Sequence, residues 1–485
     1  MAINLKKIKY GDLGFFWFKK IKDRYLLTNE EGNYFFLTEK EFSDLLGGEL
    51  NKNEQPYLSL AKKNFIKSNF NPDLAVQRYR SRHQYMFHGP ILHIIVVTLR
   101  CNHQCVYCHA SAQNMDQGGV DMSLDTAVKA LDVIFETTSP FVVIEFQGGE
   151  PLVNWPVVEF VVEEAQKKSK LTGKSLELRL VSNFSLMTEE KYKYLLKNNV
   201  SLCVSLDGPE ELHNKNRPLI DGGKKGNAYK KVAYWKKRFD KDYPGLEKRG
   251  YIWKMASIIT ISRFSLSYYK EIINEFVDMG FESLFLRPLD PFGFSKKAWQ
   301  QIGYSADDFN KFYRKIMDYI IEVNLKGKKI EERFAKIFLV KMLTDEDINM
   351  VDFRSPCGAG TGQMAYNYNG DVYTCDEGRM LSMMGDEMFK IGNVYKDTYR
   401  ELLNSPVVKT VCLASCLSGV AGCADCAFQP YCGVCPILNY FEQGNIFGQM
   451  PANSRCKINQ AILGYLFEKM SDEKIKKVFE SWMKR

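Results

Sequence analysis

Residues 92–108 have the sequence LHIIVVTLRCNHQCVYC. The first eight are mostly apolar and β-branched, which predicts a strand buried on both faces of a parallel sheet. Cys101, Cys105 and Cys108 follow directly, with the spacing C-x3-C-x2-C. Because chemistry in α/β folds concentrates on loops at the carboxyl ends of strands, this placement predicts a functional site.

This strand is the first of a series that extends to about residue 290. Further apolar runs of β-forming residues lie at 141–146, 176–181, 202–206, 255–261 and 284–286. Amphipathic stretches separate them. After the expected N-cap Ser123, for example, Ala127, Leu131 and Ile134 fall on one helical face. Six strand–helix units in a row predict an α/β fold with a parallel sheet, either open or curled into a partial barrel.

Changes in composition divide the chain into five expected segments. These are a small N-terminal α+β module at 1–88, the strand–helix domain at 89–300, a helical linker at 301–349, a Cys-rich domain at 350–460 and a C-terminal helix at 461–485. In the first segment, residues 25–28 and 34–37 predict two strands joined by a turn. Thr38 is the expected N-cap of a following helix.

The composition excludes several classes of protein. The 485 residues are 45% hydrophobic and 26% charged, which fits a folded globular chain rather than a disordered or fibrous one. No apolar run is long enough to span a membrane, and the aromatic cluster at 15–18 is too short for a signal-peptide core. We therefore expect a cytoplasmic protein with no membrane partner. The net charge of +8 does not indicate nucleic acid, although residues 1–90 hold 15 Lys and Arg against 10 Asp and Glu residues.

In a reducing compartment, the 13 cysteines are expected to be metal ligands or catalytic thiols rather than disulfides. The thiolates of Cys101, Cys105 and Cys108 can hold three irons of a [4Fe–4S] cluster and leave the fourth iron open to an amine and a carboxylate. The same residues allow other interpretations. Cys105 to His109 form the C-x-x-C-H string of haem attachment, and a zinc site or buried structural thiols are also compatible with the spacing.

With Tyr107 before its last cysteine, this cluster resembles the signature of radical S-adenosylmethionine (SAM) enzymes. The resemblance implies a partial (β/α)6 TIM-like barrel of the radical SAM type. It also implies two cofactors, SAM and a [4Fe–4S] cluster on Cys101, Cys105 and Cys108. In that family, one electron from the cluster cleaves SAM into methionine and a 5′-deoxyadenosyl radical, which takes a hydrogen atom from an unactivated C–H bond.

Further matches lie at the ends of the following strands. Residues 148–150 resemble the family's GGE motif beside the methionine amine of SAM, and Arg217 matches an arginine whose planar cation pairs with the SAM carboxylate. Leu286 stands where relatives pack against adenine. The implied SAM-binding set is Tyr107, Gly148, Gly149, Glu150, Ser182, Asn183, Ser205, Asp207, Arg217 and Leu286. By themselves, the two glycines also fit a tight turn before a helix, and Leu286 fits an ordinary core position.

The Cys-rich domain holds most of the remaining cysteines. They are Cys357, Cys375, Cys412, Cys416, Cys423, Cys426, Cys432, Cys435 and Cys456. With Gly370 before Cys375, their spacing resembles the SPASM extension, which holds auxiliary [4Fe–4S] clusters in peptide-modifying radical SAM enzymes. The resemblance implies a first auxiliary cluster on Cys423, Cys426, Cys432 and Cys456.

The second auxiliary cluster is implied less completely. Cys357, Cys375 and Cys435 would supply three of its ligands, and Cys412, Cys416 or the substrate would supply the fourth. The spacer before Cys435 has two residues where the family has three. Two C-x2-C pairs also suit a zinc ribbon, which is the competing interpretation.

Asp376 follows Cys375 and matches an acid that accepts a proton in some SPASM relatives. A carboxylate beside a cluster could take the proton that a substrate radical loses. The competing interpretation is a structural acid, paired with Arg379. Cys203 lies inside a predicted strand and is expected to be a small buried hydrophobe.

Along the whole chain, the sequence is similar to the His-Xaa-Ser system radical SAM maturase (HxsB) family. The stretches that carry this similarity are 23–29, 98–103, 145–152, 285–288, 376–380 and 426–433. The resemblance implies a maturase that modifies a ribosomally synthesised precursor peptide and receives electrons from a flavodoxin or ferredoxin. Residues 1–88 would bind a leader peptide as an added edge strand, or serve only as a structural cap.

Two other functions share part of this pattern. A sulfatase maturase that generates formylglycine would have the same SAM and SPASM motifs. A non-enzymatic iron–sulfur electron carrier would explain the cysteines, but it would not explain residues 148–150 or Arg217.

Overall fold

The computed structural model describes residues 10–221 and 223–483. The first nine residues of the predicted N-terminal module lie outside the described residues. Contacts between residues divide the chain into two compact units. The first unit is Met1–Phe87, Ala335–Cys357 and Leu413–Arg485, and the second is His88–Phe334 and Gly358–Cys412. The five predicted segment boundaries stay predictions.

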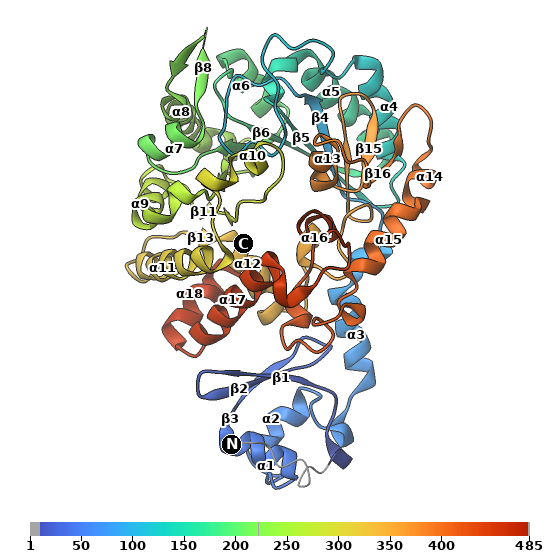
Figure 1. The fold of residues 1–485 in the computed structure, drawn as a ribbon, viewed down its shortest axis with the longest axis vertical. Coiled ribbons are helices and arrows are strands. Elements are labelled where there is room, and N and C mark those ends of the chain that lie inside the picture. Colours follow the sequence, from blue (N-terminus) through green and yellow to red (C-terminus); the bar gives the residue numbers. More distant parts are fainter. Residues whose placement is uncertain (1–9, 222, 484–485) are drawn as a thin grey trace. The chain divides into compact units, whose positions relative to one another are not determined.

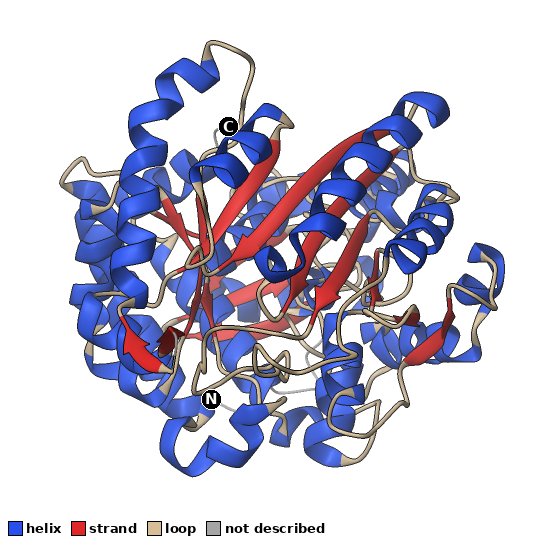
Figure 2. Ribbon diagram, turned by 90° about the horizontal axis from the view of Figure 1, so that it is seen from above, coloured by secondary structure: helices blue, strands red, loops and turns tan. Residues whose placement is uncertain are grey.

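The second unit is built on a mixed sheet, which Figure 2 shows in red with helices flanking it. Among the described residues it has nine strands, in the order β12-β10-β7-β6-β5-β4-β14-β15-β16. The parallel series consists of β4 (Leu92–Thr98), β5 (Phe141–Gly148), β6 (Ser175–Ser182), β7 (Val200–Ser205), β10 (Ala256–Thr260) and β12 (Leu286–Arg287). This sequential parallel order confirms the predicted fold class, a series of strand–helix units around a parallel core.

Helices lie between these strands, as predicted, and after the last of them (Figure 1). They are α4 (Leu124–Phe135), α5 (Trp155–Thr172), α6 (Glu189–Lys197), α7 (Glu210–Asn216), α8 (Ala228–Glu247), α9 (Tyr269–Asp278), α10 (Phe294–Ile302) and α11 (Ala306–Leu325). The predicted N-cap Ser123 accepts a hydrogen bond from the Thr126 backbone N–H at 3.1 Å. Ala127, Leu131 and Ile134 are fully buried on the core face of α4.

The predicted strand at 284–286 is divided. Ser283–Leu284 forms β11, which pairs with β13 (Glu331–Glu332), while Leu286–Arg287 forms β12, which pairs with β10. The reason is a buried carboxylate: Glu332 Oε1 accepts a hydrogen bond from the Leu286 backbone N–H at 3.0 Å. A side chain distant in sequence therefore replaces a ladder bond, which a local apolar pattern cannot reveal.

The sequence did not predict the far edge of the sheet. Past β4 the sheet continues into β14 (Gln363–Tyr366), β15 (Asp371–Tyr373) and β16 (Lys390–Asn393). These strands are three or four residues long, too short for a clear alternation of polar and apolar residues. Short helices α13 (Asp376–Ser382) and α14 (Tyr399–Asn404) complete the unit, together with the small hairpin of β8 (Leu219–Asp221) and β9 (Lys224–Gly226).

The first unit begins with an antiparallel sheet in the order β1-β2-β3. Its strands are β1 (Trp17–Ile21), β2 (Arg24–Thr28) and β3 (Tyr34–Thr38), and α1 (Glu39–Gly47), α2 (Tyr57–Lys62) and α3 (Pro72–Arg82) follow. The predicted hairpin and the predicted cap are confirmed, because Thr38 forms a reciprocal capping box with Glu41 at the start of α1. Strand β1 was missed, since the exposed Lys19 and Lys20 interrupt its apolar pattern.

The remaining helices of the first unit come from later parts of the chain. They are α12 (Arg333–Leu343), which enters this unit at Ala335, α15 (Pro406–Ser415), which enters it at Leu413, α16 (Pro436–Gln443), α17 (Ser454–Lys469) and α18 (Glu473–Met483). The predicted single helix at 461–485 is wrong in its continuity. Asp472 Oδ1 accepts from the Lys474 backbone N–H at 2.8 Å and starts a second helix there. In residues 10–221 and 223–483, no helix is both long and apolar enough to cross a membrane.

Candidate functional site

The loop after β4 holds the three cysteines of the first motif. Hydrogen bonds within the loop hold two of the three sulfurs: the His103 N–H donates to Cys101 Sγ at 3.3 Å, and the Ala112 N–H donates to Cys108 Sγ at 3.4 Å. Backbone donors of this kind stabilise sulfurs that carry negative charge when they bind iron. The loop is therefore shaped for thiolates as well as for thiols.

The electrostatics of these cysteines fit a bound metal cluster. Burial raises the pKa of all three thiols, and the pKa of Cys105 is raised to about 12. Neighbouring cysteines are a further cause that raises the pKa values of Cys101 and Cys105. Bringing buried thiolates together is unfavourable unless cations compensate them, and iron supplies that charge. In the described part of the chain, no three Cys, His, Asp or Glu side chains approach closely enough to share one metal ion. The ligands of a [4Fe–4S] cluster bind different irons and need not converge in that way.

A cavity of about 180 Å³ opens beside this loop, at the carboxyl ends of β4, β5, β6 and β7. Among the predicted site residues, it is lined by Cys101, Cys105, Tyr107, Cys108, Gly148, Gly149, Glu150, Ser182, Asn183, Ser205 and Arg217. The structure thus brings together most of the predicted SAM-binding set with the predicted iron ligands. Asp207 and Leu286 do not line the cavity.

Gly148 and Gly149 let the turn after β5 lie against the cysteine loop. Gly148 has a φ of 128°, and a Cβ atom on either glycine would collide with the backbone carbonyl oxygens of Thr98 or Arg100. The turn is held there because the Gly149 N–H donates to the Thr98 carbonyl, and the Glu150 N–H to the Arg100 carbonyl, both at 2.8 Å. The two glycines therefore serve close backbone approach, and this approach shapes one wall of the cavity.

Glu150 fixes the neighbouring strand end. Its buried carboxylate accepts from Ser182 Oγ at 2.7 Å, from the Asn183 N–H at 2.8 Å and from the Leu152 N–H at 3.1 Å. Burial raises its pKa, and these hydrogen bonds oppose the rise. The carboxylate thus joins the turn after β5 to the end of β6 at the cavity wall.

Arg217 is held by a buried ion pair. Its Nε lies 3.1 Å from Asp207 Oδ1, and Tyr107 donates its hydroxyl to Asp207 Oδ2. Burial disfavours the charge of Arg217, but Asp207, followed by Tyr107, raises its pKa, so the guanidinium stays charged at the cavity wall. Asp207 is fully buried behind Arg217. The structure therefore places it as the counterion that orients Arg217.

Leu286 is fully buried in β12, as its competing interpretation as a core residue requires. The cavity instead has lining residues that the sequence did not single out, including Ile258 and Thr260 of β10 and Met380 of α13. The alternation of residues 258 and 260 along one strand was a usable signal. No local pattern pointed to Met380, which reaches the cavity from a helix of the Cys-rich region.

Asp376 lies at the start of α13 and is mostly buried. Its Oδ1 accepts from Arg379 Nε at 2.8 Å, which is the pairing that the competing interpretation gave. Arg379 is fully buried, and its Nη1 and Nη2 have no hydrogen-bond partner among the described residues. Asp376 itself does not line the cavity, so its role in proton transfer stays a prediction.

In the first unit, the four cysteines predicted for one auxiliary cluster lie together. Burial is the largest cause of the raised pKa of Cys423, and Cys432, Cys456 and Cys426 raise that pKa further. Burial, followed by the charge of Cys426, raises the pKa of Cys432 to about 12. Side-chain amides approach the sulfurs as well: Gln460 Nε2 donates to Cys456 Sγ at 3.3 Å, and Asn459 Nδ2 to Cys432 Sγ at 3.6 Å. This donor set fits an iron–sulfur cluster.

The other predicted auxiliary ligands are distributed over both units. Cys357, Cys416 and Cys435 belong to the first unit, and Cys375 and Cys412 to the second. Their shared cluster stays a prediction. Cys203 lies in β7 as predicted, but it is half-buried rather than fully buried.

Comparisons with known proteins agree with this geometry. Residues 95–240 match the family model of the radical SAM superfamily, and residues 357–436 match that of the SPASM iron–sulfur cluster-binding domain. The cysteine-type anaerobic sulfatase-maturating enzyme of Clostridium perfringens is 22% identical over 312 residues, which cover 63% of this chain and 77% of the relative.

Solved structures show the same fold. Native anSMEcpe with bound AdoMet has a TM-score of 0.65 at 19% identity, covering 81% of this chain and 100% of that chain. Streptococcus suis SuiB bound to the precursor peptide SuiA has a TM-score of 0.51 at 13% identity, covering 90% of this chain and 98% of that chain. These likenesses confirm the predicted partial barrel followed by an SPASM domain.

The domains also establish the cofactors. The radical SAM domain binds SAM and a [4Fe–4S] cluster, and the SPASM domain binds auxiliary iron–sulfur clusters. The chain is a radical SAM enzyme that carries an SPASM iron–sulfur domain.

Proposed function

We propose that this enzyme modifies a ribosomally synthesised precursor peptide by abstracting a hydrogen atom from it. One observation carries the proposal: a single cavity joins the cysteine loop, the turn at 148–150 and the paired guanidinium of Arg217. That combination supplies ligands for iron, close backbone approach for a small molecule, and a fixed cation for its carboxylate.

Each part of the site has a separate task. Bound together, a reduced [4Fe–4S] cluster and SAM would supply a 5′-deoxyadenosyl radical, the agent of hydrogen abstraction. Cys101, Cys105 and Cys108 would bind the iron. Arg217, oriented by Asp207, would hold the methionyl carboxylate of SAM. The buried Glu150 bridge keeps the strand ends fixed while these groups bind.

Asp376 is proposed as the proton acceptor for the substrate. A substrate carbon radical that would pass one electron to an auxiliary iron–sulfur cluster also loses a proton, and a nearby carboxylate can take that proton. Arg379 would hold the Asp376 carboxylate through the 2.8 Å bond to Nε. In this role Asp376 affects the modified product, whereas cleavage of SAM does not depend on it.

The partner is proposed to be a peptide for three reasons. The fold is shared with a precursor-peptide complex of SuiB, the chain is similar to the HxsB family, and the N-terminal module carries a positive balance that suits an acidic leader. Residues 1–88 would then bind the leader. We also propose that the enzyme works in the cytoplasm and receives electrons from a flavodoxin or ferredoxin.

A second candidate function is the oxidation of a Cys or Ser side chain of a sulfatase to formylglycine. The similarity to the sulfatase-maturating enzyme of Clostridium perfringens favours it. The two candidates use the same SAM chemistry and differ in the substrate that the enzyme accepts.

The test begins with anaerobic reconstitution of the full chain with iron and sulfide, reduction with dithionite, addition of SAM and measurement of 5′-deoxyadenosine. We expect product from the wild type and none above background when Cys101, Cys105 and Cys108 are all changed to Ala. The matched control is Cys203→Ala, a strand cysteine outside the cavity. Loss of product in the control alone, or product in the triple variant, would contradict the assignment.

The substrate is identified in a second step. The loaded enzyme is incubated with a precursor peptide encoded beside its gene, or with a peptide containing the modification segment of a sulfatase, and the masses of both are followed. A mass change in the precursor peptide supports the first function, and a change in the sulfatase peptide supports the second.

A further inference from the structure

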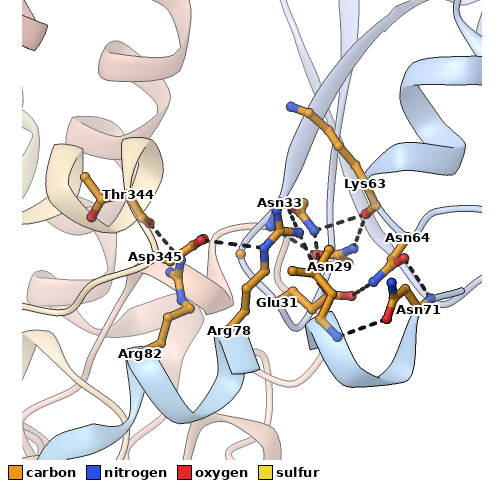
Figure 3. Close-up of polar contacts among 12 residues, drawn as sticks. Asn29, Glu31, Asn33, Lys63, Asn64, Asn71, Arg78, Arg82, Thr344 and Asp345 are labelled. Atoms are coloured by element: carbon orange, nitrogen blue, oxygen red, sulfur yellow. Dashed lines mark hydrogen bonds and ion pairs between the residues drawn. The ribbon is translucent and has the colours of Figure 1, made fainter. Parts of the chain in front are cut away.

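The first unit contains a cavity that has no part in the chemistry proposed above. Its volume is about 270 Å³, and it lies among the turn between β2 and β3, the end of α2, helix α3 and the segment after α12 (Figure 3). The lining residues used below are Gly32, Lys63, Arg78 and Asp345. Most of its walls are polar, so a polar ligand fits it better than an apolar one.

The walls of this cavity are fixed before any ligand binds. Arg82 is buried and donates to the carbonyl oxygens of Lys341 and Pro430, both at 3.0 Å. Gly32, at a φ of 77°, lies directly against the Arg82 guanidinium, and its carbonyl accepts from the Tyr431 hydroxyl at 3.0 Å. A cavity with rigid walls loses little entropy when it binds a ligand.

Arg78 provides one cationic wall. Its Nη1 donates to Asn33 Oδ1 at 3.1 Å and to Glu31 Oε2 at 3.3 Å (Figure 3). Its Nε is buried without a hydrogen-bond partner among the described residues, and the nearest carboxylate oxygen in an ion pair with it is Asp345 Oδ2 at 3.6 Å. Asp345 is 59% exposed. An exposed carboxylate thus already stands close to Arg78, at a distance longer than a hydrogen bond.

Lys63 provides the second cation. Its Nζ donates to the Tyr34 carbonyl at 2.8 Å, and within the described residues it has no ion-pair partner. Burial lowers its pKa, and the cations Arg78, Lys476 and Lys62 lower it further. An anion in the cavity would relieve this repulsion and form the ion pair that Lys63 lacks.

We propose that this cavity binds the side-chain carboxylate of an acidic residue in the peptide partner, displacing Asp345 from Arg78. The proposal rests on the proposed function for its partner and names the chemistry by which that partner is recognised. Arg78 and Lys63 both line the cavity, and a singly charged, planar carboxylate is an anion that such a pair of cations can bind. A phosphate dianion is disfavoured because Glu31 and Asp345 both face Arg78. The positive balance of residues 1–90 steers an acidic peptide to this part of the chain.

The test uses the full chain under anaerobic conditions and a short fluorescein-labelled peptide with spaced glutamates, followed by fluorescence anisotropy. Lys63→Gln keeps a donor for the Tyr34 carbonyl and removes the charge, and we expect the Kd to rise about tenfold. The matched control is Lys62→Gln, an exposed neighbour, for which we expect a change of less than about twofold. Asp345→Asn removes the competing carboxylate and is expected to lower the Kd about threefold.

Two further arms distinguish the sources of negative charge. The same peptide with Gln at every Glu position is expected to bind wild type and Lys63→Gln alike, and glutarate is expected to compete better than inorganic phosphate. Equal effects of Lys63→Gln and Lys62→Gln, equal binding of the Gln peptide, or stronger competition by phosphate would overturn the proposal. If Lys63→Gln unfolds the module, the exposed Asp345→Asn variant still decides the question.

The result is kept separate from the fate of the proposed function. Formation of 5′-deoxyadenosine by the wild type without peptide is measured in parallel. If the wild type cleaves SAM, and Lys63→Gln and Asp345→Asn bind the acidic peptide as the wild type does, only the proposed carboxylate pocket is contradicted. A chain that distinguishes the peptides and never cleaves SAM contradicts the proposed function alone.

Discussion

The two cysteine sites of this enzyme are built in different ways. Cys101, Cys105 and Cys108 follow a seven-residue strand inside a large mixed sheet, beside a cavity whose walls are joined by buried hydrogen bonds. Cys423, Cys426 and Cys432 lie in turns and loops, and Cys456 lies in the first turn of α17. Cys423, Cys432 and Cys456 pack with a small core of Leu417, Val420, Val434 and Met450. From this contrast we expect the protein alone to form the first site, and the second site to depend on iron for much of its order.

Removal of iron should give the largest difference between the two sites. We expect chelation to expose the amides of residues 413–456 almost completely to hydrogen exchange, while protection in β4 to β7 changes by less than about tenfold. The small core of the Cys-rich segment cannot compensate the loss of cluster bonds. Hydrogen exchange of the chelated and loaded chains, followed by mass spectrometry, measures both regions at once. Comparable loss of protection in β4 to β7 would refute the contrast.

The preformed character of the SAM site depends on its buried ion pair. Asp207→Asn leaves the Arg217 charge without its counterion, and we expect a loss of about 3 kcal/mol in the unfolding free energy of the second unit. The control is Asp132→Asn, which removes the exposed pair with Lys168 and should cost less than about 1 kcal/mol. The unfolding free energy is measured by urea unfolding, with hydrogen exchange of the β7 amides as the signal for the second unit. Similar values for the two variants would mean that the Arg217 pair does not support the site.

The glycine turn should matter for binding more than for stability. In Gly149→Ala, the added methyl group meets the Arg100 carbonyl, so the turn must move, and we expect the Kd for SAM to rise about tenfold to hundredfold. Gly118 has open space around it and no positive φ, so Gly118→Ala is the matched control and should bind SAM as the wild type does. Isothermal titration of the reconstituted enzyme with SAM measures both. Unchanged affinity in Gly149→Ala would show that the turn is not part of the SAM site.

The sequence predicted the first site better than the second because its signals are local. The strand at residues 92–98, its cysteines and the glycine turn each have a pattern that can be recognised within about ten residues. Three features were not predicted, because each depends on a contact that a local pattern does not show. Asp207 was predicted as a SAM-binding residue but not as the counterion that orients Arg217, Glu332 divides β11 from β12, and Met380 lines the cavity from α13 of the Cys-rich domain.

In the first unit, the missed features also come from contacts between distant segments. Strand β1 is fixed in part by Trp17, whose indole Nε1 donates to the Ala424 carbonyl at 2.6 Å. The cavity at Lys63 and Arg78 needs the segment at 342–345, which is more than 250 residues further along the chain. Local patterns contain no information about such pairings, since each segment alone resembles an ordinary turn or helix end.

Acidification should give the smallest of the expected effects. His213 Nδ1 accepts a hydrogen bond from the Asp207 N–H at 3.2 Å, and burial, then Arg217, lowers the pKa of His213 from 6.5 to about 3. The unfolded chain therefore binds a proton between these two values that the folded chain does not, so this contribution to stability is present above pH 6.5 and is lost as the pH falls towards 3. Between pH 7 and pH 5 we expect a loss of about 1–2 kcal/mol from this residue.

His213→Asn keeps an acceptor near the Asp207 N–H and does not titrate, so it should lose less stability than the wild type over the same pH range. His88→Gln changes an exposed histidine and should follow the wild type. Urea unfolding of the three proteins at pH 7 and pH 5 gives the comparison. If the unfolding free energy of His213→Asn falls between pH 7 and pH 5 as much as that of the wild type, the site tolerates a protonated His213. The hydrogen bond that orients Asp207, and through it Arg217, would then be dispensable.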